Sequence, residues 1–190
     1  MRTLFERALV LATVAHRDQK RKYTNEPYIV HPIAVAQIVN EVKIGDHAVT
    51  GDELCAAAVL HDVIEDCGVT ALQIEIICNK VVAELVLEVT DVSTKADGNR
   101  RVRKAKDLRH LAGSSWAGAT IKLADLIHNT QTITVHDKDF AVVYMREKAD
   151  LLEVLKHGDG KLWKMAHERV LEYNINRPGN EFLKEMAKKI

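Results

Sequence analysis

The sequence has few aromatic residues and no excess of charge of either sign. Phe, Trp and Tyr make up only 5% of its 190 residues, so Ala and the aliphatic residues must supply most of the core. That balance favours helices over sheets. The 27 basic residues are matched by 27 acidic residues. No overall field therefore attracts nucleic acid or an anionic membrane, and we expect neither as a partner.

The sequence also lacks an apolar run of the roughly 20 residues that crossing a bilayer requires. The apolar stretch at residues 8–15 could be mistaken for a targeting segment. Glu6 and Arg7 interrupt it, however, and its apolar positions follow helical spacing. We interpret this segment as a first amphipathic helix.

Cysteines are too few, and odd in number, for a disulfide framework. Cys55, Cys67 and Cys78 form no CxxC pair, and each lies in an apolar or helical context. This pattern is typical of reduced, partly buried thiols, and we expect a cytoplasmic protein.

Most of the chain shows a helical pattern of apolar residues, with breaks at turn residues. We expect an all-α fold of about ten helices in a single domain over residues 1–190. One helix is expected to run from about residue 52 to 66, with Thr50 or Asp52 as its cap and Gly68 at its end. A basic helix over 100–111 is expected to turn inward the residues Val102, Ala105, Leu108 and Leu111. The last helices, over 137–190, are expected to break near 158–160 and 178–179.

Four ionisable residues crowd the end of the helix expected at 52–66. His61 and Asp62 are adjacent, and Glu65 and Asp66 follow each of them by four positions. On one continuous helix this spacing would place each acidic residue on the face of its partner. Such crowding is costly unless a cation or hydrogen bonds compensate it.

Two further residues extend this group to a metal-binding pattern. His31 precedes Pro32 at a helix start, and Asp125 lies in the apolar frame IKLADLIHN. Two imidazoles and two carboxylates suit Mn²⁺, Fe²⁺ or Zn²⁺ better than Ca²⁺. Helical bundles build internal metal sites from ligands on separate helices in this way.

The sequence resembles the HD-domain phosphohydrolases, which use His…His-Asp…Asp as metal ligands. His31, His61, Asp62 and Asp125 match that order. The resemblance is narrower for the hydrolase domain of the RelA/SpoT homologues, and it spans about residues 8–134. The matching motifs are AHRDQKRK at 15–22, PYIVHP at 27–32, HDVIED at 61–66 and KLADLIHN at 122–129.

The resemblance implies a function and residue roles. It implies a small alarmone hydrolase that removes the 3′-pyrophosphate of guanosine tetra- or pentaphosphate with one divalent transition metal, for which we expect Mn²⁺. Glu65 and Asp66 would then carry out the proton transfer. The expected substrate contacts are Arg21, Lys22 and Asn129, with Lys95 and Arg100 considered for the pyrophosphate. Leu126 departs from the family, which commonly has Arg or Lys there.

Two alternatives remain open at the level of sequence. The same site could act on another phosphorylated nucleotide, such as an adenosine-based alarmone. The chain could also be a non-catalytic alarmone-binding module. The native metal and the oligomeric state cannot be read from the pattern.

Overall fold

The computed structural model describes residues 2–177, and within this range the chain is helical with no β-strand. Among these described residues, the only β-type pairing is an isolated antiparallel bridge between Lys20 and Pro27. The expected all-α fold of about ten helices is therefore confirmed. The α-helices are α1 (Leu4–Ala15), α2 (Val30–Asn40), α3 (Gly51–Val59), α4 (Val63–Cys67), α5 (Ala71–Ile77), α6 (Lys80–Val89), α7 (Arg100–Leu111), α8 (Trp116–His136), α9 (Lys138–Val154) and α10 (Gly160–Asn176), with a short 3₁₀ helix η1 (Lys95–Asp97) before α7.

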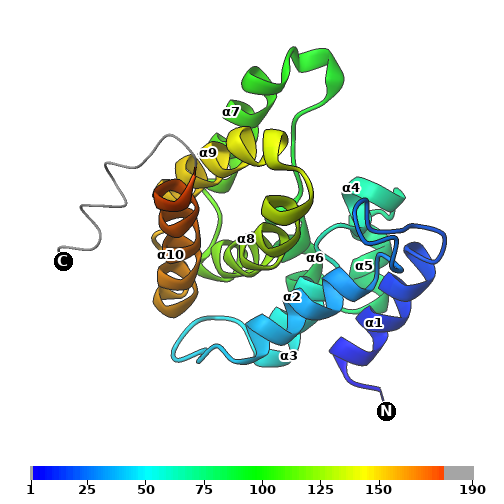
Figure 1. Cartoon of the computed structure of the whole chain (residues 1–190). Helices are drawn as coiled ribbons and strands as arrows, with labels where there is room; N and C mark the ends of the chain where they lie inside the picture. Colours follow the sequence, from blue (N-terminus) through cyan, green and yellow to red (C-terminus); the bar gives the residue numbers. More distant parts are fainter. Residues whose placement is uncertain (1, 178–190) are drawn as a thin grey trace.

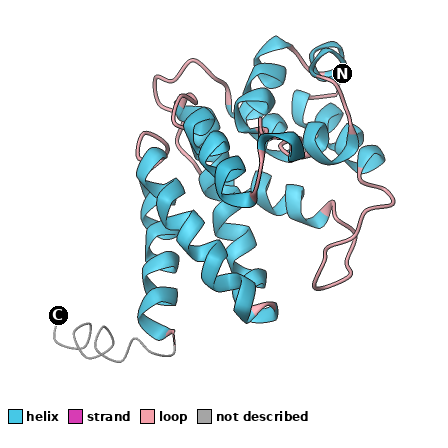
Figure 2. Ribbon diagram, turned by 90° about the horizontal axis from the view of Figure 1, so that it is seen from above, coloured by secondary structure: helices cyan, strands magenta, loops and turns pink. Residues whose placement is uncertain are grey.

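Helix α8 is the centre of the arrangement (Figure 1). It packs against α2, α3 and α6 on the N-terminal side and against α9 and α10 on the C-terminal side. The view from above shows the same helices joined by loops (Figure 2). Every residue from 117 to 127 is buried, because α8 is covered on most of its circumference. An ionisable residue in the middle of this helix must therefore have partners.

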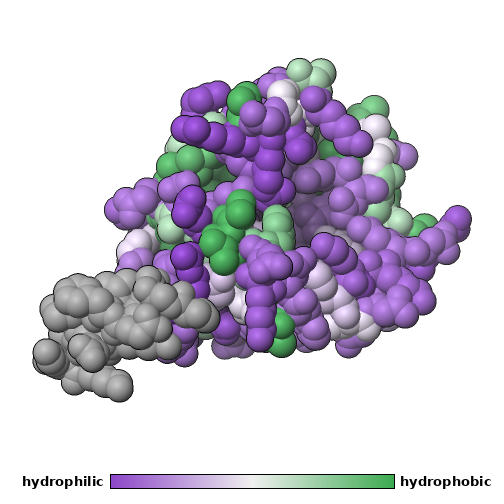
Figure 3. Space-filling model, turned by 45° about the horizontal axis from the view of Figure 1, so that its top comes forward, coloured by the Kyte–Doolittle hydropathy of each residue, from purple (hydrophilic) through white to green (hydrophobic). Residues whose placement is uncertain are grey.

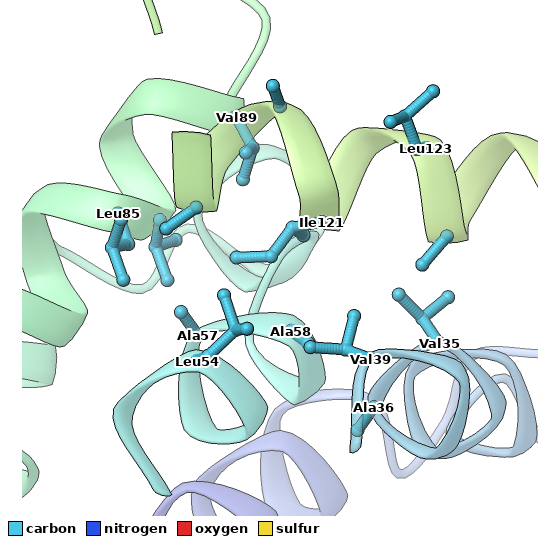
Figure 4. Close-up of a cluster of buried hydrophobic side chains, with 14 of the residues drawn as sticks. Val35, Ala36, Val39, Leu54, Ala57, Ala58, Leu85, Val89, Ile121 and Leu123 are labelled. Atoms are coloured by element: carbon cyan, nitrogen blue, oxygen red, sulfur yellow. The ribbon is translucent and has the colours of Figure 1, made fainter. Parts of the chain in front are cut away.

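The core between α8 and the N-terminal helices is built from aliphatic and small side chains (Figure 4). Ile121 and Leu123 of α8 are fully buried, as are Ala57 and Ala58 of α3. The small alanine side chains allow α3 to approach its neighbours closely, and α3 packs on α1, α2, α6 and α8. The end of α3 is thereby held close to the middle of α8.

The start of α3 is fixed by two side chains that the sequence singled out as alternative caps. Thr50 caps the helix in a reciprocal pair with Glu53. Asp52 instead accepts hydrogen bonds from the backbone N–H groups of Leu4 (2.8 Å) and Phe5 (3.1 Å). Thr50 is the cap, and Asp52 ties α3 to the first turn of α1.

The expectation of one helix over about 52–66 is wrong. The helix ends at Val59 and resumes at Val63, so Leu60, His61 and Asp62 form a turn. The Nδ1 atom of His61 lies 2.8 Å from the carbonyl oxygen of Ala58. In a continuous helix that oxygen would accept from the N–H of Asp62, so the side chain competes with the helix for its acceptor. Gly68, in the left-handed region at φ 69°, ends α4 as expected.

The predicted inward face of α7 is also wrong in part. Val102 is 48% exposed and Ala105 is exposed, whereas Leu111 is buried. The side chain that does turn inward is Asp107, which accepts from the N–H and the hydroxyl of Ser93, each at 2.8 Å. Helix α7 lies at the edge of the molecule and packs mainly on α9 and α6, so little surface is available to bury its first turns.

The C-terminal helices contribute to the same core as the rest. Met145 and Leu152 of α9 and Leu162 and Val170 of α10 are buried. The break expected near 158–160 is present, and the one expected near 178–179 lies outside the described residues. Among the described helices, none combines the length and the apolar character needed to span a membrane.

Candidate metal centre

Three separate parts of the fold bring the four predicted ligands together. His31 comes from the first turn of α2, His61 and Asp62 from the turn between α3 and α4, and Asp125 from the middle of α8. The Nε2 atom of His31 lies 3.2 Å from Asp125 Oδ1 and 3.6 Å from Asp62 Oδ2. The Nε2 atom of His61 lies 2.9 Å from Asp62 Oδ2 and 3.7 Å from Asp125 Oδ1.

Both histidines turn Nε2 toward this cluster and use Nδ1 elsewhere. His61 Nδ1 donates to the carbonyl oxygen of Ala58, which leaves a lone pair on Nε2. His31 Nδ1 lies 2.7 Å from Nδ1 of His128. Burial, followed by the neighbouring His31, lowers the pKa of His128 to about 4, so His128 is neutral and can accept this hydrogen bond. Metal-binding histidines are commonly oriented by such a second hydrogen bond.

The carboxylates are also held from outside the cluster. The hydroxyl of Tyr28 donates to Asp62 Oδ2 at 2.6 Å. The amide of Asn129 donates to Asp125 Oδ1 at 2.6 Å, and the ammonium group of Lys122 lies 3.7 Å from Asp125 Oδ2. Burial alone would raise the pKa of Asp125, but the two histidines and Lys122 hold it well below its usual value. Asp125 is therefore ionised.

The donor set fits a divalent transition metal. The Nε2 atoms of His31 and His61 are buried and have no hydrogen-bond partner. One ligand atom each from His31, His61 and Asp62 lies within 4.8 Å of the others, and the carboxylate of Asp125 faces both nitrogens. Two buried imidazole nitrogens this close to two carboxylates need a cation between them. Without a metal ion that cation is a proton: burial opposes it, but Asp62 and Asp125 raise the pKa of His61 to about 10. Mixed imidazole and carboxylate ligands suit a transition ion.

Glu65 and Asp66 lie on α4, next to the cluster and on different sides of it. Both side chains are exposed. Glu65 accepts a hydrogen bond from the N–H of Asp91 at 3.3 Å, and Asp66 accepts one from the amide of Gln19 at 2.8 Å. Partial desolvation and the nearby Asp91 raise the pKa of Glu65. A raised pKa brings a carboxylate closer to the range of an effective proton acceptor.

Arg21 and Asn129, predicted as substrate contacts, are linked to the cluster. Arg21 donates to the amide oxygen of Asn129 at 2.9 Å, and Asn129 donates in turn to Asp125. The guanidinium of Arg21 also lies 5.7 Å from the centre of the Tyr28 ring. These contacts connect the loop before α2 to the ligand on α8.

The other three residues predicted as substrate contacts make no contact with the cluster. Lys22 lies beside Tyr23 and 3.5 Å from Asp137, at the end of α8. Arg100 makes a two-point ion pair with Glu147, with both N–O distances 2.7 Å. Lys95 is exposed on η1. Leu126 is fully buried in the apolar core.

Several residues near the centre received no role from the sequence. Tyr28 and Lys122 lie inside the motifs PYIVHP and KLADLIHN. The one sequence feature that could indicate a role for them is that each is a polar side chain among apolar neighbours. Tyr144 and Lys148 on α9 lie in a segment without any motif. Burial, and then the charge of Asp125, raises the pKa of Tyr144 well above its usual value.

Comparisons with known proteins show the family and the fold of this chain. A family model described as an HD domain matches residues 8–160. A probable guanosine-3′,5′-bis(diphosphate) 3′-pyrophosphohydrolase of Synechocystis sp. is 33% identical over 85% of this chain and 21% of the relative. The bifunctional (p)ppGpp synthase/hydrolase SpoT of Escherichia coli strain K12 is 35% identical over 79% of this chain and 21% of the relative. The chain thus spans about a fifth of the length of these relatives.

A solved structure has the same fold over nearly its whole length. It is described by the words "A metazoan ortholog of SpoT hydrolyzes ppGpp and plays a role in starvation responses". Its TM-score is 0.77 at 26% sequence identity, and the match covers 95% of this chain and 98% of that chain.

Proposed function

Because the chain belongs to the HD domain family, we propose that it hydrolyses the 3′-pyrophosphate of guanosine tetra- and pentaphosphate. The observation that carries the proposal is the convergence of two buried, unpaired Nε2 atoms with two carboxylates. The named activity of the two relatives and of the structurally similar protein supports this choice of substrate. Because the chain spans about a fifth of the relatives' length, the activity named for them is a proposal for this chain.

The proposed ligands are His31, His61, Asp62 and Asp125, and the proposed metal is one Mn²⁺ ion. A divalent ion held there would supply the positive charge that cleavage of a phosphate ester requires. The ligand types support Mn²⁺ or another transition ion over Ca²⁺.

Glu65 and Asp66 are proposed to handle the proton of the attacking water. In this reaction the water oxygen bonds to the phosphorus attached to the ribose 3′-oxygen. The bond between that phosphorus and the 3′-oxygen breaks, and the 3′-oxygen takes up a proton. The products are pyrophosphate and GDP or GTP. The position of Glu65 beside the cluster and its raised pKa support a role as proton acceptor.

The nucleotide is proposed to bind along the loop before α2. Arg21 has a planar guanidinium that can stack on a base or bind phosphate, and Lys22 follows it on the exposed side. Asn129 is proposed to position Asp125 through one hydrogen bond and the substrate-binding Arg21 through another. Lys95 and Arg100 are proposed as outer phosphate contacts, for which Arg100 would have to leave Glu147.

We also propose that the whole chain acts as one domain. One cluster of buried residues runs from Ala8 on α1 to Val170 on α10, which joins the motif-bearing part to the C-terminal helices. The cytoplasm, which holds the guanosine nucleotide pool, is the compartment that the proposed substrate implies.

The test is to incubate metal-loaded protein with guanosine tetraphosphate and with its adenosine counterpart, and to separate the products. We expect pyrophosphate from the guanosine substrate. Glu65→Gln and Asp66→Asn should each lower kcat by about 10²-fold or more, with metal affinity retained. Glu75→Gln, an exposed acidic residue on α5, is the matched control and should leave kcat unchanged.

Three results would contradict the proposal in different ways. Release of orthophosphate would exclude a pyrophosphohydrolase. Turnover of the adenosine substrate alone would exclude guanosine specificity. Tight binding without turnover in Mn²⁺ would indicate a binding module.

A further inference from the structure

Three lysines from three helices lie beside the metal centre, on the side of Glu65. Lys104 comes from α7, Lys122 from α8 and Lys148 from α9. The ammonium of Lys104 lies 2.6 Å from Asp91 Oδ2, and that of Lys122 lies 3.7 Å from Asp125 Oδ2. Lys148 interacts electrostatically with both of these lysines and both of these carboxylates, so the three cations share one region.

Lys148 is the least compensated of the three. Its side chain is half-buried, its ammonium lies 4.7 Å from the centre of the Tyr144 ring, and no carboxylate lies within ion-pair distance of it among residues 2–177. Burial, with a contribution from Lys122 and Lys104, lowers its pKa to about 8. Lys104 pairs with Asp91 and also lies 3.7 Å from Asp107, and Lys122 lies 3.7 Å from Asp125. Of the three lysines, Lys148 alone has no carboxylate at ion-pair distance within residues 2–177, so its ammonium group can take a further anion as its partner.

The position of this lysine cluster (Lys104, Lys122 and Lys148) indicates which kind of anion could bind there. It adjoins the ligand Asp125 and the proposed proton acceptor Glu65, with both of which Lys122 interacts. A phosphate group bound there would lie beside the proposed reaction centre. Hydrophilic residues surround a hollow near the middle of the view in which the top of the molecule comes forward (Figure 3).

We propose that Lys148, together with Lys122, binds the terminal phosphate of the 3′-diphosphate, so that this chain distinguishes a 3′-diphosphate from a 3′-monophosphate. The inference rests on the proposed function, because it names a part of the same substrate. Lys104 serves as a positioning residue that holds Asp91 at the edge of the cluster. An ammonium group is a common phosphate partner, and its charge-assisted hydrogen bonds contribute more than neutral ones.

The experiment compares Lys148→Met and Lys148→Arg with the wild type. Inorganic pyrophosphate is titrated into the metal-loaded proteins by calorimetry, and it is also tested as a competitive inhibitor. We expect Lys148→Met to weaken pyrophosphate binding about 10-fold or more, a loss typical of one charged hydrogen bond, and Lys148→Arg to restore most of it. Lys138→Met, an exposed lysine on the same helix, is the matched control and should bind like the wild type.

Turnover provides the second measurement. For guanosine tetraphosphate, Lys148→Met should raise KM by a similar factor. For the analogue with a 3′-monophosphate, its KM should equal that of the wild type, because the group that Lys148 binds is missing. A merely structural role of Lys148 would move both KM values together.

The two proposals fail in distinguishable ways. If wild-type protein turns over no alarmone but binds pyrophosphate through Lys148, the proposed function is wrong and the anion site stands. If Lys148→Met folds with an unchanged circular dichroism spectrum and binds pyrophosphate as tightly as the wild type, the inference is wrong. Failure of the wild type to bind pyrophosphate at all would also overturn it.

Discussion

Each proposed ligand has a second atom or a neighbouring group that fixes its orientation. His61 is held by the Ala58 carbonyl, His31 by His128, Asp62 by Tyr28, and Asp125 by Asn129. These partners come from α3, α8 and the loop before α2. Metal affinity should therefore depend on residues that never touch the metal.

His128→Phe tests this dependence. The substitution keeps a ring next to His31 but removes the nitrogen that lies 2.7 Å from His31 Nδ1. We expect metal affinity to fall about 10- to 100-fold, as is typical when such a partner is lost. The dissociation constant is measured by competition with a chelator. His167→Phe, an exposed histidine on α10, should retain wild-type affinity, and an equal affinity for His128→Phe would show that the contact does not orient His31.

Sequence could predict the ligand candidates but not their partners. The ligands stand out because ionisable residues in apolar frames, such as Asp125, need compensation. Tyr28 and Lys148 approach the ligands only because segments distant in sequence pack together, and no local pattern records that approach. The charge of Arg100 was visible in the sequence, whereas its pairing with Glu147 could be known only from the structure.

At the scale of helices, apolar periodicity predicted most of the elements and missed the turn at residues 60–62. Periodicity reports which face of a segment is buried, and Leu60 and Val63 are both fully buried whether or not the helix continues. The break comes from the hydrogen bond between the His61 side chain and the Ala58 carbonyl. Nothing in the local pattern distinguishes that acceptor from its neighbours. Similarly, the edge position of α7 leaves Val102 exposed although its spacing suggested burial.

The turn between α9 and α10 packs so closely on α8 that one added methyl group should be harmful. A Cβ atom at Gly158 would lie 2.9 Å from Leu123 Cδ1 and 3.1 Å from the backbone carbon of Ala119. We expect Gly158→Ala to lower the free energy of unfolding by about 1–3 kcal/mol. At Gly160, two residues later, a Cβ atom meets nothing within 4 Å. Gly160→Ala should therefore stabilise by about 0.4–1 kcal/mol.

Urea denaturation measures both changes. Equal and small effects at the two positions would mean that the turn can move away from α8 without cost, and that the close packing does not contribute to stability.

For the whole molecule, a metal ion would join parts of the chain that otherwise meet through side-chain packing and a few hydrogen bonds. The proposed ligands lie on α2, the α3–α4 turn and α8. Because the unfolded chain does not present this arrangement, metal should bind mainly to the folded protein. Mn²⁺ at 100 times its dissociation constant should add about 2.7 kcal/mol to the free energy of unfolding. Excess chelator should lower Tm by about 5–10 °C, a shift expected for a domain of this size.

Differential scanning calorimetry with Mn²⁺ and with chelator measures the change. His61→Ala removes one ligand and should lose the dependence of Tm on metal. A Tm that is the same with metal and with chelator in the wild type would exclude a metal site built from these residues.

The order of the ligands along the chain has a consequence for how the protein folds. His31, His61 and Asp62 lie on segments that pack through contacts of shorter sequence separation than those that bring in Asp125 with α8. Local contacts form early, and long-range docking has to overcome the entropy of closing a larger loop. An ion captured by the first three ligands would therefore attract the carboxylate of Asp125 and favour the docking of α8. The rate of folding, and not only its equilibrium, should then respond to the metal supply.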